Sequence, residues 1–142
     1  MKSKRALLVL FFILLLAGCS AKEEPQSPGS CLERMPQKIT GLVVKGERSE
    51  TNVISNVWPM LCKAEEFYLE RRKTNPKRSG IIELELRVEF NGEIGEFSIL
   101  RNTVDDPDLE KDVIGLFEFF DFDPFGKHNS ESEIILPIRF SP

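Results

Sequence analysis

The sequence predicts an α+β domain in which two helices cover one face of a three-stranded antiparallel sheet. Two observations predict the sheet. Apolar and charged residues alternate on both sides of an Asn91-Gly92 pair in residues 81–101, and they alternate again in residues 132–140. A third observation predicts the helices, because apolar residues recur at spacings of three and four in residues 53–68 and 109–120.

Residues 1–18 are predicted to be a lipoprotein signal peptide. A basic start precedes an unbroken apolar run, Ala6–Leu16, which is too short to span a bilayer stably. The run ends in Leu16-Ala17-Gly18-Cys19, which resembles the lipobox of bacterial lipoproteins. By this resemblance Cys19 carries the lipid, and Ser20 beside it favours the periplasmic face of the outer membrane. An ordinary secretory signal with a chance cysteine is the alternative.

Residues 19–31 are predicted to form an acylated, flexible tether, because they are rich in proline, serine and charge. Loss of residues 1–18 removes three basic groups and takes the formal net charge from -4 to -7. An acidic mature protein disfavours nucleic acid as a partner and disfavours electrostatic attachment to anionic lipid. We therefore expect contact with the membrane through the lipid anchor.

Residues 32–142 are expected to form a single small α+β domain with its core in residues 53–140. Near its start, Ile39–Val44 is a candidate for a short strand, which the predicted three-stranded sheet does not include. No internal repeat is present.

The first helix has Ser49 or Thr51 as its candidate N-cap, and Asn75-Pro76 ends it. Pro59 conflicts with this helix, since proline removes a backbone donor inside it. Either the helix bends at Pro59, or a short turn precedes a main helix that begins near Trp58.

The segment from Ile82 to Phe90 places apolar residues on one face and charged residues on the other. Asn91-Gly92 predicts a two-residue type I′ turn, which sets the register of the hairpin. In this register Leu86 lies opposite Phe97, Leu84 opposite Ile99 and Val88 opposite Gly95. On the other face Arg87 pairs with Glu96.

The second helix begins at Asp105 or Asp106 as N-cap, with Pro107 in its first turn. A calcium site is the alternative for these carboxylates, but the spacing lacks the glycine and the distal glutamate of the known calcium loop. Five phenylalanines then fall between residues 117 and 125. We expect them to fill the core, with an aromatic ligand box as the alternative.

The last strand contains Pro137, and proline is tolerated on an edge strand but rarely in a central one. The Ile81–Phe90 strand has no proline or glycine and suits the centre. The predicted spatial order is therefore 2-1-3: the second hairpin strand, the first hairpin strand and the last strand. The exposed edge of the last strand is the predicted partner-binding site, and its residues are Ile134, Ile135, Leu136, Pro137, Ile138, Arg139 and Phe140.

Two cysteines remain after acylation of Cys19, and a disulfide between Cys31 and Cys62 is plausible in an oxidising compartment. Two unpaired thiols are the alternative. The single histidine, His128, lies in a polar loop without a second imidazole or thiol nearby in sequence. We therefore predict no catalytic residues, no metal site, no cofactor and no small-molecule substrate.

With these elements placed, residues Val53–Phe140 resemble the C-terminal domain of the AgmX/PglI family, a relative of the TonB C-terminal domain. The matching positions are Tyr68, Asn75-Pro76, Gly80, Gly92, Asp106-Pro107-Asp108-Leu109-Glu110, Phe122-Asp123-Pro124, Pro137 and Phe140. The family often carries a cysteine where this chain has Phe67, and another in the second helix, so that family disulfide is absent here. The resemblance implies a TonB-like α+β fold that works in the cell envelope.

Two functions fit these observations. The first is a non-enzymatic protein-binding or adaptor lipoprotein that grips an envelope protein at the exposed sheet edge. The alternative is a structural subunit of a stable cell-envelope assembly, for which the phenylalanine cluster is the cue.

Overall fold

The structure, a computed structural model, describes residues 29–142. The predicted signal peptide, the predicted lipidation site Cys19 and most of the predicted tether lie outside these residues. In chain order the elements are the 3-10 helix η2 (Cys31–Arg34), β1 (Val43–Lys45), α2 (Glu50–Arg72), β2 (Gly80–Glu89), β3 (Ile94–Asn102), α3 (Pro107–Phe117) and β4 (Glu131–Phe140). No helix among residues 29–142 combines the length and apolar character that a membrane span needs.

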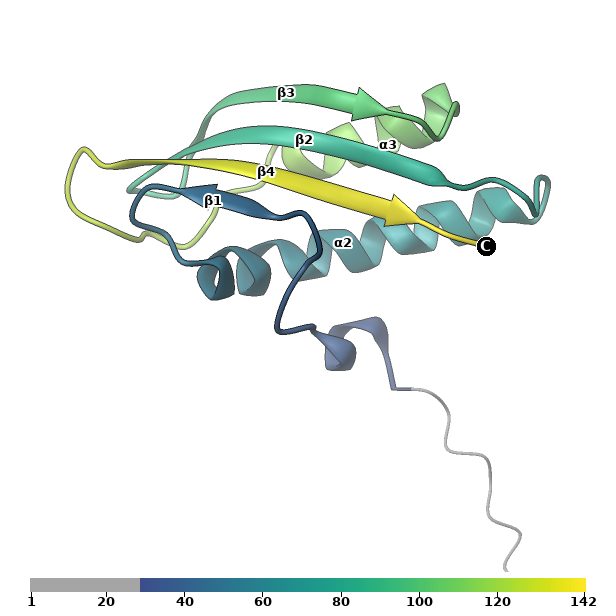
Figure 1. The fold of residues 1–142 in the computed structure, drawn as a ribbon, viewed down its shortest axis with the longest axis horizontal. Helices are drawn as coiled ribbons and strands as arrows, with labels where there is room; N and C mark the ends of the chain where they lie inside the picture. The colour runs from purple at the N-terminus through teal and green to yellow at the C-terminus, as the bar shows by residue number, and fades with distance from the viewer. Residues whose placement is uncertain (1–28) are drawn as a thin grey trace, which may run out of the picture.

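The four strands form one antiparallel sheet in the order β1-β4-β2-β3, and α2 and α3 lie on the same face of it (Figure 1). The predicted α+β class, with an antiparallel sheet and two helices, is confirmed. The predicted count of three strands is wrong, because β1 adds to the outer side of β4 and places Val43 opposite Ile135. The last strand is therefore an inner strand, and β1 and β3 are the edges.

The core lies between the sheet and the two helices. The inward residues of β2, which include Leu84, Leu86 and Val88, are fully buried. They belong to one cluster with Val57 of α2 and Val113 of α3. Apolar and charged residues alternate in β2 because one face of the strand packs against the helices and the other faces solvent, as predicted.

The hairpin turn differs from its prediction. The Gly92 N–H donates to the Glu89 carbonyl (3.0 Å) and the Glu89 N–H donates to the Glu93 carbonyl (2.9 Å). Asn91 does not have the positive φ that a type I′ turn requires, whereas Gly92 has φ +100°. The loop is therefore one residue longer than predicted, with glycine in the left-handed position.

A bulge beside the turn restores the predicted register. The longer loop places Val88 opposite Ile94 rather than Gly95, and the shift between Arg87 and Val88 leaves Gly95 as the extra residue. Beyond it Leu86 lies opposite Phe97 and Leu84 opposite Ile99, as predicted. The predicted ion pair between Arg87 and Glu96 is also present, at 3.3 Å.

The turn of the hairpin is docked against the segment that follows α3. The Phe122 N–H donates to the Gly92 carbonyl (2.9 Å), and the Phe125 N–H donates to the Phe90 carbonyl (2.8 Å). A Cβ atom on Gly92 would lie 1.8 Å from the Phe122 carbonyl oxygen, so only glycine fits at this contact.

Arg48 ties the same region to the start of α2, and its side chain is only 4% exposed. Its guanidinium donates to the Asp123 carbonyl (2.9 Å), the Glu89 carbonyl (3.1 Å) and the Asn52 side chain (3.0 Å). It also lies over the Phe122 ring, 5.2 Å from the centroid. Burial lowers the pKa of Arg48, and the Asp123 carboxylate partly offsets that effect.

The helix α2 is continuous through Pro59, so no separate main helix begins near Trp58. Ser49 is its N-cap and accepts a hydrogen bond from the Asn52 N–H. Pro59 and Ser55, whose carbonyl loses its helical donor, both lie on the exposed side of the helix. Solvent can therefore hydrate that carbonyl, which reduces the cost of the proline.

The phenylalanines after α3 divide between core and surface. Phe117 and Phe122 are 2% exposed, as core filling requires, and Phe120 packs against the same cluster. Phe119 is 93% exposed and Phe125 is 37% exposed. Core filling therefore accounts for part of the cluster only.

Candidate functional site

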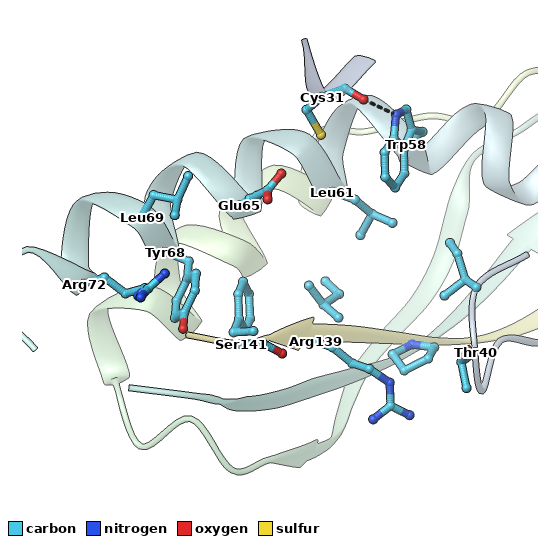
Figure 2. Close-up of a pocket in the computed structure, with 14 residues that line it drawn as sticks. Cys31, Thr40, Trp58, Leu61, Glu65, Tyr68, Leu69, Arg72, Arg139 and Ser141 are labelled. Atoms are coloured by element: carbon cyan, nitrogen blue, oxygen red, sulfur yellow. Dashed lines mark hydrogen bonds between the residues drawn. The ribbon is translucent and has the colours of Figure 1, made fainter. Parts of the chain in front are cut away.

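A groove of about 460 Å³ runs between α2 and the end of β4, and we call it the α2–β4 groove (Figure 2). Figure 2 shows the helix on one side, the strand on the other, and the segment around Thr40 at one end. Its lining is mostly apolar, and the residues are Cys31, Ile39, Thr40, Trp58, Leu61, Glu65, Tyr68, Leu69, Arg72, Pro137, Ile138, Arg139, Phe140 and Ser141.

The helix side of the groove follows from the spacing of apolar residues in α2. Trp58, Leu61 and Tyr68 share one side of the helix because they are separated by three and seven residues, about one and two turns. Leu69 lies eight residues after Leu61 and borders the same side. Tyr68 is 3% exposed and donates to the Arg78 carbonyl, whereas Leu69 is 48% exposed. The apolar surface of α2 is thus wider than the sheet can cover, and its excess forms this side.

The strand side exists because the pairing of β4 with β1 ends early. The last pair is Val43 with Ile135. Beyond it Pro137 has no N–H to donate, and Gly41 has φ +87°, which turns the preceding chain away from a strand path. The part of β4 from Pro137 to Phe140 therefore pairs with β2 on one side and with no strand among residues 29–142 on the other.

The predicted partner-binding edge needs correction at this point. Ile134 and Leu136 are fully buried and belong to the core, and Ile135 lies opposite Val43 of β1. The remaining predicted residues, Pro137, Ile138, Arg139 and Phe140, do line the groove. The error arose because three residues of β1 cover half of the strand, and so short a strand gives a weak sequence pattern.

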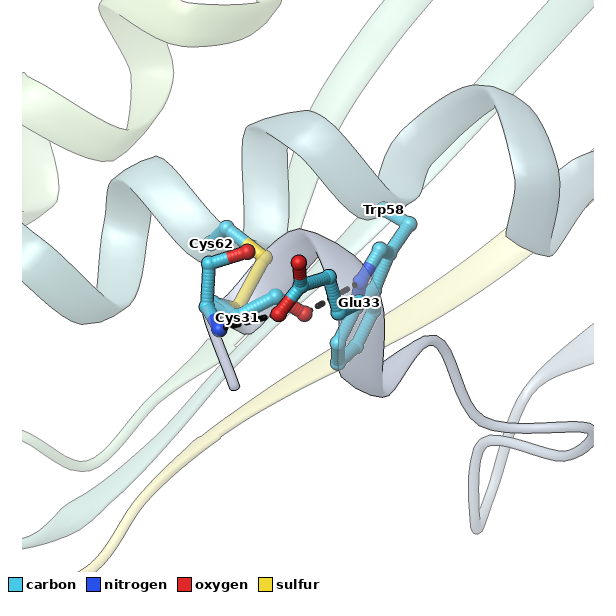
Figure 3. The surroundings of a disulfide bond; sticks show 5 residues. Cys31, Glu33, Trp58 and Cys62 are labelled. Carbon is cyan, nitrogen blue, oxygen red and sulfur yellow. Dashed lines mark hydrogen bonds between the residues drawn. A yellow bond between two sulfur atoms is a disulfide. The ribbon is translucent and has the colours of Figure 1, made fainter. Parts of the chain in front are cut away.

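A disulfide joins Cys31 of η2 to Cys62 of α2, with the two sulfur atoms 2.06 Å apart (Figure 3). Beside it the Trp58 indole N–H donates to the Cys31 carbonyl (2.9 Å). The Ser30 N–H donates to the Glu33 carboxylate (2.8 Å), which closes the first turn of η2. These contacts hold the beginning of the domain against the helix side of the groove.

We expect the variant carrying Cys31→Ser and Cys62→Ser to lose about 3–4 kcal/mol of unfolding free energy by loop-closure arithmetic. The cysteines are 31 residues apart, and the bond restricts that length of chain in the unfolded state. Urea unfolding followed by the emission of Trp58, the single tryptophan, measures the loss. A reductant should lower the stability of the natural chain and leave the variant unchanged. Equal stability of the natural chain and the variant in the absence of reductant would contradict the prediction.

The charged groups of the groove are few and of both signs. The Arg72 guanidinium lies over the Tyr68 ring, 5.7 Å from the centroid, and its Nε is buried without a hydrogen-bond partner among residues 29–142. Arg139 and Glu65 are exposed on opposite sides of the groove. The lining therefore offers apolar contact, two guanidinium groups and one carboxylate to whatever binds there.

A second charged cluster joins the end of α2 to the start of α3. Asp106 is the N-cap of α3, accepts from the N–H groups of Asp108 (3.1 Å) and Leu109 (3.0 Å), and pairs with Arg78. Burial opposes its ionisation, but the Leu109 N–H and Arg78 outweigh burial and hold the pKa of Asp106 below its usual range. This cluster accounts for the predicted N-cap, and the ion pair of Arg71 in α2 with Asp112 in α3 (2.6 Å) fixes the two helices against each other.

We expect Asp106→Asn to lower the unfolding free energy at neutral pH by about 1.5–3 kcal/mol, because asparagine keeps the cap acceptor but not the charge that pairs with Arg78. The depressed pKa of Asp106 stabilises the fold above its unfolded pKa of about 3.9, and this contribution is lost as the pH falls through the folded pKa. The difference between the variant and the natural chain should therefore shrink in acid. Urea unfolding at several pH values between neutral and strongly acidic measures it, and a constant difference would contradict the assignment.

The single histidine lies apart from the groove. His128 stacks edge-on against Phe90 with the ring centroids 4.8 Å apart, and no hydrogen bond joins it to a carboxylate or hydroxyl among residues 29–142. No three His, Cys, Asp or Glu side chains among the described residues gather in a way that would hold a metal ion. The groove itself was missed, although the half-buried Leu61 and the exposed Leu69, on a helix with a full core face, were a signal for it.

Comparison of the chain with protein-family models, with curated proteins and with solved structures finds no match. Among the described residues, the candidate binding site is the α2–β4 groove, an apolar depression beside a stretch of β4 that pairs with no strand on its outer side.

Proposed function

We propose that this protein is a lipid-anchored lipoprotein of the cell envelope whose domain binds a partner protein in the α2–β4 groove and catalyses no reaction. The predicted signal peptide and Cys19 support the anchor and a place on the periplasmic face of the outer membrane. The resemblance to the AgmX/PglI family and to TonB-like domains supports a role in gripping envelope proteins. The unpaired stretch of β4 beside the apolar groove carries the proposal.

The binding mode that fits this surface is the addition of an extended segment beside residues 137–140 of β4. Main-chain hydrogen bonds to the strand would supply affinity for any sequence, and alternate side chains would enter the groove and give selectivity. Leu61 and Leu69 offer apolar contact for those side chains. Pro137 limits the length of pairing, because it offers a carbonyl but no N–H.

The predicted tether is long enough to place the groove at some distance from the lipid anchor. Cys31 comes twelve residues after Cys19, and a fully extended chain of that length spans roughly 40 Å. Cys31 lines the groove and is bonded to α2, so the tether joins the domain beside the proposed binding site. A partner in or near the same membrane would be within reach.

Photo-crosslinking in cells tests the proposal. A photoreactive amino acid replaces Arg139 or Leu69 in the full-length lipoprotein, and Glu85 on the charged face of the sheet serves as the control position. We expect both groove positions to crosslink to one extended segment of an envelope protein, and the control position not to do so. Leu69→Lys should lower the crosslink yield from position 139 by roughly tenfold without loss of stability, since Leu69 is about half exposed. Equal yields from all three positions would overturn the proposal.

The alternative is a structural subunit of a stable envelope assembly, and the exposure of Phe119 favours it. Native mass measurement after mild extraction separates the two. A complex of fixed stoichiometry would support the assembly, whereas a monomer that binds its partner reversibly would support the adaptor.

A further inference from the structure

A second groove, of about 370 Å³, opens at the opposite edge of the sheet, and we call it the β3–α3 groove. It lies between the start of β3 and the end of α3. Its lining residues are Glu89, Glu93, Ile94, Gly95, Phe97, Phe117, Glu118, Phe120 and Asp121. None of them lines the α2–β4 groove, so the two surfaces are separate.

The floor of the β3–α3 groove is aromatic. The rings of Phe97 and Phe117 are stacked with centroids 6.5 Å apart, and Phe117 meets Phe120 edge-on at 5.9 Å. Phe119 lies between two lining residues in sequence and is 93% exposed. An exposed phenylalanine contributes little to folding, and one next to an aromatic groove floor in sequence indicates a docking surface.

The edge of the sheet at this groove is open but bulged. No strand among residues 29–142 pairs with the outer side of β3. Gly95 is the extra residue of the bulge, and a bulge on an edge strand disfavours continuous pairing with another strand. The groove is therefore better suited to receive a side chain than to extend the sheet.

The rim of the groove is uniformly acidic. Glu89, Glu93, Glu118 and Asp121 contribute four carboxylates, and the lining contains no lysine, arginine or histidine. No ion pair is formed by any of the four among the described residues. Such a rim repels anionic lipid and attracts cations, and an aromatic floor adds favourable contact with arginine or lysine.

We propose that the β3–α3 groove binds a cationic segment of a partner protein in which an aromatic or aliphatic side chain is flanked by lysines or arginines. The apolar side chain lies against Phe97 and Phe120, and the flanking cations face the carboxylates of the rim. The exposed Phe119, between the lining residues Glu118 and Phe120 in sequence, offers a further apolar contact to the segment. This surface is independent of the α2–β4 groove, so either proposal can fail without the other.

Binding of a defined probe to the full acylated protein in neutral detergent tests the proposal. The probe is a short fluorescent peptide of alternating lysine and phenylalanine, and its glutamate counterpart is the reference. We expect fluorescence anisotropy to show binding of the lysine peptide at low salt and at least about tenfold weaker binding of the glutamate peptide. Absence of binding by the lysine peptide would overturn the proposal.

Matched variants separate the groove from the general negative charge of the protein. The variant with Glu118→Lys and Asp121→Lys should weaken binding by roughly tenfold or more. The control with Glu66→Lys and Glu70→Lys changes the net charge by the same amount on the exposed side of α2, outside the groove, and should change binding less than about twofold. An equal loss in both variants would show attraction to net charge alone and would overturn the site.

Two further variants test the apolar part of the groove. Phe119→Ser should weaken binding while urea unfolding stays unchanged. Gly95→Leu places a side chain in the groove at a position where a Cβ meets no atom closer than 3.4 Å, and it should block binding. Unchanged binding in both variants would overturn the proposal. Self-association that Phe119→Ser abolishes would identify a second copy of the chain as the occupant instead, and would also overturn it.

Discussion

Gly92→Ala is expected to lower the unfolding free energy by about 3–5 kcal/mol, or to prevent folding of a domain this small. Two independent costs combine at this position. The backbone has φ +100°, where alanine is strained, and the new Cβ would lie 1.8 Å from the Phe122 carbonyl oxygen. Relief of that contact requires displacement of the Phe122 main chain, which breaks the hydrogen bond from its N–H to Gly92.

The control for Gly92→Ala is Gly95→Ala in the same hairpin. Gly95 does not have a left-handed φ, and its Cβ would meet no atom closer than 3.4 Å. We expect a change within about 0.5 kcal/mol, measured by urea unfolding followed by circular dichroism. Gly92→Asn separates the two costs, because asparagine tolerates the left-handed region but keeps the Cβ. Near-natural stability of Gly92→Asn would show that the contact with Phe122 is not restrictive.

The fold was predictable where local pattern and tertiary packing agree. The alternation of β2 follows from its single buried face, and the core pairs of the hairpin followed from that alternation. The turn was predicted wrongly because Asn91-Gly92 suits two loop lengths. Packing of Gly92 on Phe122, which lies 30 residues later, selects the longer loop, and the bulge at Gly95 then restores the register.

The candidate site was less predictable from the sequence, because it depends on how far β1 covers the outer side of β4. Pro137 predicted an edge strand, and this was wrong, because β4 is an inner strand whose outer side is half covered by β1. Three residues of β1 hold little local signal, and their position follows from the turn at Gly41. The helix side of the groove consists of the apolar residues of α2 that extend past the sheet. The local sequence pattern does not specify how much of α2 the sheet covers.

Arg48 was not identified from the sequence, since a single arginine before a helix has the pattern of a solvated residue. Its burial follows from three segments that converge on it: the start of α2, the end of β2 and the loop after α3. Two of its partners are main-chain carbonyls, and of these the Glu89 carbonyl also accepts from the Gly92 N–H. The guanidinium suits this place because its planar donors reach several acceptors at once.

Arg48→Met is expected to lower the unfolding free energy by about 3–5 kcal/mol, because methionine is apolar and makes none of the three hydrogen bonds of the guanidinium. Removal of the guanidinium leaves the Asp123 carbonyl without this donor, and an unsatisfied acceptor costs about 1–3 kcal/mol. It also removes two further hydrogen bonds from a charged group, to the Glu89 carbonyl and the Asn52 side chain, and such bonds are each worth about 1.5–3 kcal/mol. The Glu89 carbonyl keeps its hydrogen bond from the Gly92 N–H. Burial of a charge opposes folding, so part of the loss is offset by its removal, as the lowered pKa of Arg48 indicates.

Arg48→Lys decides whether charge or geometry matters at this junction. Lysine keeps a charge but has one donor group at its tip, so it cannot reach Asp123, Glu89 and Asn52 together. We expect it to be nearly as unstable as Arg48→Met in urea unfolding. Stability of the lysine variant close to that of the natural chain would show that charge near Asp123 is sufficient. A methionine variant as stable as the natural chain would show instead that hydrophobic packing on Phe122 holds the junction together.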